Sequence, residues 1–175
     1  EIDVGLIYGP GSTFHMRVEE LFGEELVAVG PPSGTLSCDK PITLATLARL
    51  PLILPSRPHG LRMVIESAAH VARIKLEVRC EADSFRVLVS LVEQGLGYTI
   101  LPLSAITGEL DEGRLTYAPL GEPKIVREVV LGTPDTITSH ATRKVIELTR
   151  DEIAQLTRSG TWRAKLRFRS GARTR

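Results

Sequence analysis

The chain has 175 residues, 42% of them hydrophobic and 25% charged, and its formal net charge is +1. This length and apolar content are enough for one or two small globular lobes, each with its own core. No apolar run approaches the roughly 18 residues of a membrane-spanning helix, and no segment resembles a secretory signal peptide. The sequence therefore predicts a protein without a membrane segment.

The net charge conceals an asymmetry along the chain. Six of the 22 lysine and arginine residues follow Trp162, so the first 162 residues carry 16 basic against 21 acidic residues. A domain that binds nucleic acid is expected to be basic, whereas this body is mildly acidic. We therefore interpret the basic end, residues 163–175, as a flexible solvated tail and not as a nucleic-acid arm.

Hydrophobic periodicity predicts strands and helices that alternate along the chain. The expected strands lie at residues 2–8, 24–29, 51–55, 75–82, 98–101, 114–120 and 127–132. The expected helices lie at residues 42–50 with Thr43 as the N-cap, 61–73, about 84–94, and 139–158, and a short turn is expected at 104–110. This alternation is typical of an α/β fold with mainly parallel sheets.

The segment Asp83–Leu103 reads as one helix that leads directly into one strand. Asp83 or Ser84 is expected to cap the helix start with a side-chain oxygen, and Gly95 is expected to take the left-handed conformation at its end. Apolar residues recur between them at helical spacing, namely Phe85, Leu88, Val89 and Val92. We expect so apolar a helix to be covered on most sides.

Two stretches rich in proline, near Pro31–Pro32 and Gly121–Pro123, indicate two crossings between lobes. We expect the first lobe to consist of residues 1–50 and 119–162, and the second of residues 51–118. A cleft would lie between the two lobes.

Catalytic and metal-binding motifs are absent from the sequence. There is no nucleophile elbow, no H-E-x-x-H, no P-loop and no C-x-x-C. The four histidines are scattered, and none has a metal-ligand partner three or four residues away. Cys38 and Cys80 stand far apart in unlike contexts, which favours two free thiols in a reducing cytoplasm. We expect no enzyme activity, no metal and no cofactor.

One loop is the main candidate for ligand binding. The loop Ser56–Gly60 follows an expected strand and precedes an expected helix, where free backbone N–H groups and the helix dipole favour an anion. Arg57, His59 and Arg62 would add to that field. The alternative is a capped loop with surface arginines.

Further candidates lie at other strand ends. Tyr8 and Gly9 end the first expected strand and would face the cleft, although an ordinary strand end is the alternative. Thr99 and Pro102 could form the floor of the cleft, or serve the core alone. Asp83 is interpreted as a helix cap in preference to a ligand contact.

The order of these segments resembles the effector-binding domain of LysR-type transcriptional regulators. The similar segments, from Ile2 to about Trp162, are D-V-G-L-I-Y, E-E-L-V-A-V, L-A-x-L-P-L-I-L-P, E-A-D-S-F with L-V-E-Q-G-L-G-Y-T-I-L-P, and E-G-R-L with R-E-V-V-L. The stretch P-L-I-L-P-S-R-P-H-G-L-R looks most like the branch of nitrogen-assimilation regulators.

The resemblance implies a two-lobed fold similar to type II periplasmic binding proteins, with a small effector between the lobes. By position, Tyr8, the Ser56–Gly60 loop and the Thr99–Pro102 strand end match the cleft wall. It also implies that an N-terminal winged helix-turn-helix, a linker helix and the opening β-α-β-α stretch of the first lobe are missing from this chain. DNA would be bound only through that winged helix-turn-helix.

We therefore expect the ligand-sensing domain of a bacterial, cytoplasmic transcription factor. Its partners would be a small effector, possibly anionic given the arginines of the loop, and further copies of the chain in a homodimer or tetramer. Members of this family commonly pair these domains antiparallel, lobe one against lobe two. The alternative is a periplasmic solute-binding protein of a transporter, and an enzyme ranks third.

Overall fold

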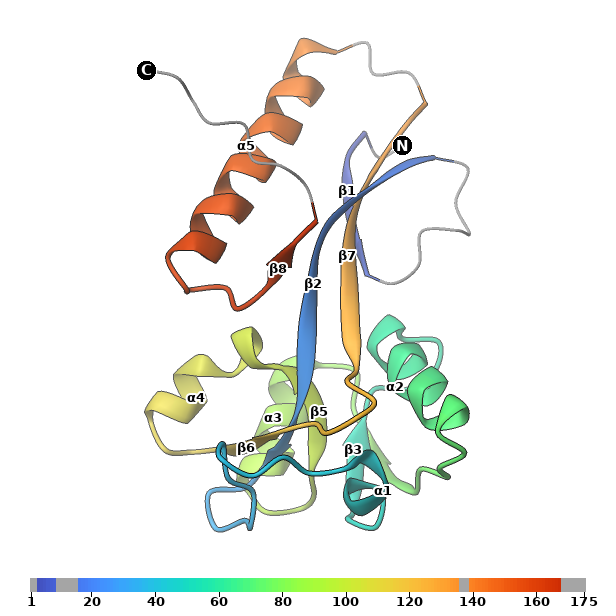
Figure 1. Cartoon of the computed structure of the whole chain (residues 1–175), viewed down its shortest axis with the longest axis vertical. Coiled ribbons are helices and arrows are strands. Elements are labelled where there is room, and N and C mark those ends of the chain that lie inside the picture. The colour runs from blue at the N-terminus through green and yellow to red at the C-terminus, as the bar shows by residue number, and fades with distance from the viewer. Residues whose placement is uncertain (1–2, 9–15, 136–138, 168–175) are drawn as a thin grey trace. The chain divides into compact units, whose positions relative to one another are not determined.

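A computed structural model describes residues 3–8, 16–135 and 139–167 of the chain (Figure 1). The strands are β1 (Gly5–Tyr8), β2 (Arg17–Gly30), β3 (Leu52–Leu54), β4 (Val78–Glu81), β5 (Thr99–Pro102), β6 (Thr116–Pro119), β7 (Val126–Thr133) and β8 (Lys165–Leu166). The helices are α1 (Leu44–Leu47), α2 (Gly60–Val71), α3 (Phe85–Glu93), η2 (Leu103–Ala105), α4 (Thr107–Asp111) and α5 (His140–Arg158).

Helix ends agree with their local sequence signals. The Thr43 hydroxyl accepts the N–H of Thr46 at 3.1 Å, and the Ser139 hydroxyl accepts the N–H of Thr142 at 3.4 Å, so both predicted caps are confirmed. Gly95 has a φ of 76° after the end of α3, as predicted for a left-handed cap.

Two expectations of local structure are wrong. Residues 103–111 form η2 and α4 where a turn was expected, and β8 places part of the basic end in a sheet, since Leu166 pairs with Phe22. Residues 168–175 lie outside the described part of the chain. The tail was expected to be flexible because its charge pattern carries no strand signal, and its two-residue strand depends on a neighbour far away in sequence.

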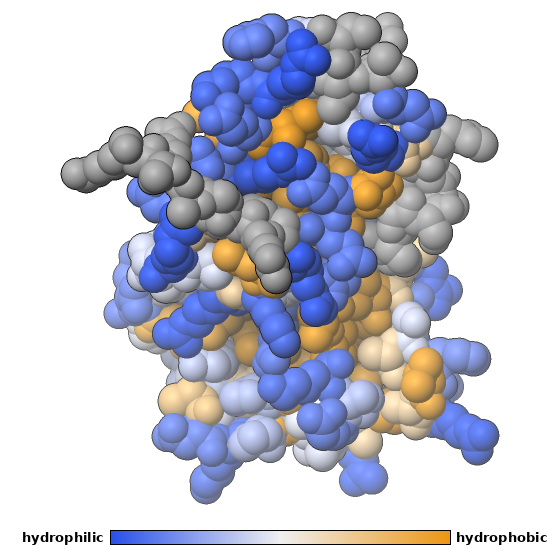
Figure 2. Space-filling view, turned by 45° about the horizontal axis from the view of Figure 1, so that its top comes forward, coloured by the Kyte–Doolittle hydropathy of each residue, from blue (hydrophilic) through white to orange (hydrophobic). Residues whose placement is uncertain are grey.

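Helix α3 is covered on one face only. Leu88, Val89 and Val92 are buried, whereas Phe85 and Val87 are 43% and 50% exposed. The expectation that this helix is covered on most sides is therefore wrong, because an apolar sequence does not by itself supply neighbours on every face. Apolar side chains reach the surface in several places among hydrophilic ones (Figure 2).

The strand pairs correct the expectation of mainly parallel sheets. In the described part of the chain, β1 pairs with β7, and β2 pairs with β5, β6 and β8, all antiparallel. Strands β3 and β4 are parallel, and a parallel bridge joins Leu52 to Tyr98. The long strand β2 serves as the shared antiparallel partner, and strand periodicity does not reveal direction. The prediction of an α/β fold is unaffected.

The chain divides into two compact units. Unit 1 contains residues 1–24 and 127–175, and unit 2 contains residues 25–126. These boundaries differ from the expected lobes, which assigned residues 25–50 and 119–126 to the first lobe. The reason is packing, because Leu26, Leu44 and Ile125 belong to the same buried cluster as Leu52 and Leu88.

Each unit has its own core. The buried cluster of unit 1 consists of Leu21, Phe22, Val129, Leu131, Ile146 and Ile153. Trp162 packs against its margin, with its ring edge-on to Phe22 at a centroid distance of 4.5 Å. Within this unit, Figure 1 shows α5 running beside β8.

We predict that Gly97→Ala destabilises unit 2, because a Cβ at Gly97 would lie 2.5 Å from the carbonyl oxygen of Pro51. The expected loss is about 1–3 kcal/mol in the free energy of unfolding, measured by urea denaturation. Gly108→Ala is the matched control, since a Cβ there meets no atom within 4 Å. Equal stability of the two variants would contradict the packing described for Gly97.

Candidate functional site

The candidate loop lies where the sequence predicted it. Ser56–Gly60 joins the end of β3 to the start of α2, and Gly60 is the first residue of the helix. His59 is the N-cap residue, and its Nδ1 accepts the N–H of Leu61 at 3.1 Å. The imidazole therefore caps a helix in this structure, which is a structural task that the sequence analysis did not assign to it.

Ser56 is held by Asp83 across the unit. The Asp83 Oδ1 accepts the N–H of Ser56 at 2.8 Å, and the Ser56 hydroxyl lies 2.7 and 2.8 Å from the two carboxylate oxygens. These hydrogen bonds lower the pKa of Asp83 below its ordinary value, the bond from the side chain of Ser56 being the largest cause. The expected cap is wrong, because Ser84 is the N-cap of α3 without a side-chain cap bond and Asp83 reaches Ser56 instead.

Arg62 is a buried cation with three acceptors. Its side chain is 7% exposed, and Nη1 donates to the carbonyl oxygen of Pro55 at 2.9 Å and to Glu81 at 3.1 Å. Its Nε donates to Glu66 at 2.6 Å. The guanidinium thus ties the end of β3 and the end of β4 to the first turns of α2. This arrangement fixes Arg62 as a structural residue and leaves its charge neutralised.

Arg57 shares the same carboxylate but is exposed. Its side chain is 70% exposed, and Nε and Nη2 donate to the two oxygens of Glu66 at 2.9 and 2.6 Å. Arg57 is the largest cause of the lowered pKa of Glu66, so this carboxylate is ionised at neutral pH. The two arginines that were expected to face an anion therefore face Glu66 and Glu81.

The end of β5 lies at the same end of unit 2 as the loop. Ile53 donates its N–H to Tyr98 at 2.8 Å and the two strands run parallel, so their carboxyl ends, at Ser56 and Pro102, point the same way. Pro102 is buried and pairs with Leu26.

Thr99 is a buried polar residue of β5 with an unusual hydroxyl. The residue is 0% exposed, and among the described residues its Oγ1 has no hydrogen-bond partner. A buried hydroxyl without a partner costs about 1–3 kcal/mol, so such a group calls for a reason beyond packing.

Tyr8 belongs to unit 1 and is considered there by itself. It is 50% exposed, and the guanidinium carbon of Arg127 lies 4.3 Å from its ring centroid. Arg127 is bound in turn by Glu24, which is 1% exposed and also accepts the indole N–H of Trp162 at 3.1 Å. Gly9, the other candidate of this strand end, lies outside the described residues.

The sequence analysis missed the residues that neutralise the candidate arginines. Glu66 carried a usable signal, because it stands four residues after Arg62 on an expected helix. Glu81 and Asp83 carried none, since their contacts depend on which strands become neighbours. The same holds for Glu24 and Arg127, which are 103 residues apart.

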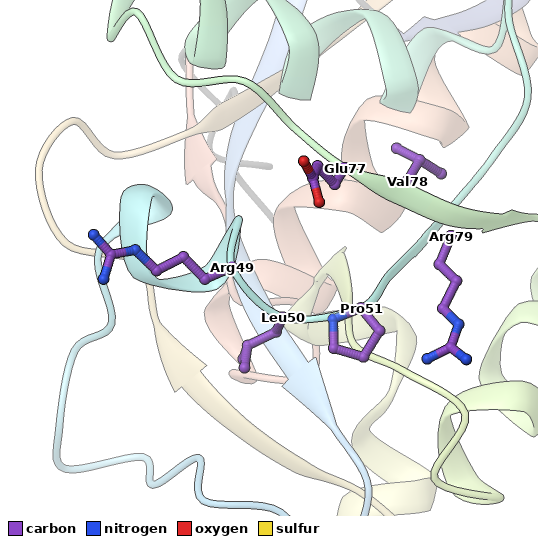
Figure 3. A pocket seen from close by; sticks show the side chains of 6 residues that line it. All are labelled: Arg49, Leu50, Pro51, Glu77, Val78 and Arg79. Carbon is purple, nitrogen blue, oxygen red and sulfur yellow. The ribbon is translucent and has the colours of Figure 1, made fainter.

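A shallow hollow of about 440 Å³ lies at the opposite, amino ends of β3 and β4. It is lined by Arg49, Leu50, Pro51, Glu77, Val78 and Arg79. Arg49 and Arg79 stand at its two sides with Leu50 and Pro51 between them, so their guanidinium groups do not converge on one point (Figure 3). The hollow is therefore not a second candidate for anion binding.

Two searches of the described residues gave negative findings. No group of histidine, cysteine, aspartate and glutamate side chains is arranged to hold a metal ion in residues 3–8, 16–135 and 139–167. Over the same ranges, no helix is long and apolar enough to cross a membrane.

Residues 1–154 match the family model of the LysR substrate binding domain. The chain is 29% identical over 163 residues to the HTH-type transcriptional regulator BbuR of Bordetella bronchiseptica, covering 93% of this chain and 50% of that protein. It is 30% identical over 131 residues to a probable hydrogen peroxide-inducible genes activator of Mycobacterium avium, covering 74% of this chain and 42% of that protein.

Solved structures show the same fold. The regulatory domain of CcmR from Synechocystis PCC6803, determined in complex with 2-PG, superposes with a TM-score of 0.76 at 18% identity, covering 90% of this chain and 74% of that chain. These findings confirm the family resemblance and the α/β fold. Nitrogen-assimilation regulators occur among the relatives beside regulators of other kinds, so the branch stays a prediction.

We predict a pH dependence at Asp83. Because its pKa is lower in the folded than in the unfolded chain, its contribution to stability is complete above the unfolded pKa of about 3.9 and is lost as the pH falls through the folded pKa. Wild type should thus exceed Asp83→Asn in urea midpoint at pH 6, and the difference should shrink below pH about 4. A difference that stays constant down to pH about 3 would contradict the lowered pKa.

Proposed function

The chain belongs to the LysR substrate-binding domain family, and we propose that it senses a small effector for a bacterial transcriptional regulator. The observation that carries this proposal is the family match over residues 1–154. The chain spans about half the length of the curated relatives it matches, 50% and 42% for two of them. DNA binding is accordingly proposed for other parts of the full-length protein, in the cytoplasm.

The effector contacts that we propose come from both units. They are Tyr8, Gly9, Ser56, Arg57, His59, Gly60, Arg62, Thr99 and Pro102. The strongest support within unit 2 is the buried Thr99 hydroxyl, which lacks a partner among the described residues and would gain one from a bound ligand.

Arg57 is the group of the loop that would change its partner. It is 70% exposed and bound to Glu66 alone, whereas Arg62 is 7% exposed and held by three acceptors. A carboxylate or other small anion would therefore replace Glu66 at Arg57 while Arg62 keeps the loop in place. Bidentate anion binding of this kind is well suited to a guanidinium.

Effector binding would act by shifting a conformational equilibrium. A ligand can do so only if it binds one conformation better than another. Exchange of Glu66 for the effector at Arg57 supplies such a difference, because it frees the first turns of α2 from one of their two ion pairs.

The alternatives receive less support. A solute-binding protein of a transporter is not favoured, since the named relatives are transcriptional regulators. The same relatives support a role without catalysis. Self-association is proposed as well, as a homodimer or tetramer.

Arg57→Ala is predicted to abolish stabilisation by an anionic effector. In a thermal-shift screen of small carboxylates and phosphate esters, the wild type should rise in melting temperature with one compound, and Arg57→Ala should not. Arg49→Ala is the matched control, because Arg49 is exposed and lies at the opposite ends of β3 and β4. An unchanged response of Arg57→Ala would contradict an anionic effector, and a response to no compound at all would count against effector sensing.

A further inference from the structure

Strand β4 has one open edge. Among the described residues it pairs only with β3, and Arg79, Cys80 and Glu81 are exposed. Ala82 donates its N–H to the carbonyl oxygen of Leu54 at 3.1 Å, so the backbone groups of Ala82 and Cys80 face β3. The N–H and C=O groups of Arg79 and Glu81 therefore face away from the sheet. Such an edge is a template for another strand.

The charges along this edge are complementary to themselves. If two copies of β4 pair antiparallel about a two-fold axis at Cys80, Arg79 of each copy stands opposite Glu81 of the other. Opposite charges at directly opposed positions stabilise an antiparallel pair, and a two-fold axis provides this contact twice. Any shift of the register by one residue loses the match.

Both charged groups are available for this contact. Arg79 makes no ion pair or hydrogen bond with another side chain in the part of the chain that the structure describes, and its side chain extends from β4 on the side away from Arg49 (Figure 3). Glu81 is 51% exposed and uses one carboxylate oxygen for Arg62, which leaves the other for a partner.

Apolar surface lies on the same side of the sheet. Side chains two residues apart on a strand share a face, so Arg79 projects on the face where Glu81 meets Arg62 of α2. Helix α2 covers that face and exposes Met63 at 58%. A second copy would therefore bury apolar as well as charged surface.

We propose that the free edge of β4 is a self-association surface, and that its occupant is the same edge of a second copy of this chain, antiparallel about Cys80. The inference is independent of effector binding and goes beyond the proposed function. It also differs from the pairing of lobe one against lobe two that the family resemblance implies.

Disulfide trapping tests the axis. In the proposed register the two Cys80 residues form a non-hydrogen-bonded pair with Cα atoms about 4.5 Å apart, within the range that a disulfide spans. Mild oxidation with copper phenanthroline should link wild type and Cys38→Ser into dimers on non-reducing gels, and should leave Cys80→Ser monomeric. Both cysteines are exposed, so access is equal. A dimer of Cys80→Ser, or no linkage in wild type, would overturn the proposal.

Sedimentation equilibrium tests the charges without oxidation. Arg79→Glu places acid opposite acid twice and should raise the dimer dissociation constant by about tenfold. Arg49→Glu makes the same change of charge at an exposed residue outside the edge and should leave the constant unchanged. Circular dichroism and urea midpoints establish that both variants fold. Equal effects of the two substitutions, or a wild type that is monomeric at every concentration, would overturn the proposal.

Discussion

The guanidinium of Arg62 is the interaction on which the arrangement of unit 2 depends. It lies almost fully buried and donates to the Pro55 carbonyl oxygen, to Glu66 and to Glu81. A buried charge is costly unless it is paired and hydrogen-bonded, so these three acceptors must stay where they are as long as Arg62 is buried. One side chain thereby fixes the exit of β3, the first turns of α2 and the end of β4.

Unit 1 follows the same principle with the signs reversed. Its buried charge is Glu24, and the groups that neutralise it are Arg127 and the indole N–H of Trp162. Arg127 in turn lies over the exposed ring of Tyr8. In each unit a buried ion pair thus sits directly behind a proposed effector contact, with Arg62 behind Arg57 and Glu24 behind Tyr8. Fixed groups behind exposed ones hold a binding surface in a defined shape.

Local parts of the fold were predictable from the sequence, and long-range contacts were not. The caps at Thr43 and Ser139 and the turn at Gly95 follow from residues within a few positions of each other. Strand direction and unit boundaries depend on which segments become neighbours, so the parallel sheets and the division at residue 50 were mistaken. The loop Ser56–Gly60 was found because a strand end before a helix start is a local pattern.

The charges around that loop show the same limit. Arg57 and Arg62 could be named from the sequence, but the carboxylates that neutralise them come from a helix turn and a separate strand. Asp83 was interpreted as a cap because it precedes a helix, and its bond to Ser56, 27 residues away, carries no local signal. The predicted positive field was therefore an overestimate.

The central claim is that Arg62 is a fixed structural cation and Arg57 an exchangeable one. It is tested most directly by comparing Arg62→Met with Arg57→Met in urea denaturation at neutral pH. Removal of one partner from a buried ion pair costs about 3–5 kcal/mol, whereas an exposed pair contributes about 0–1 kcal/mol. We expect Arg62→Met to lose about 3 kcal/mol or more and Arg57→Met less than about 1 kcal/mol. Losses of equal size in the two variants would contradict the claim.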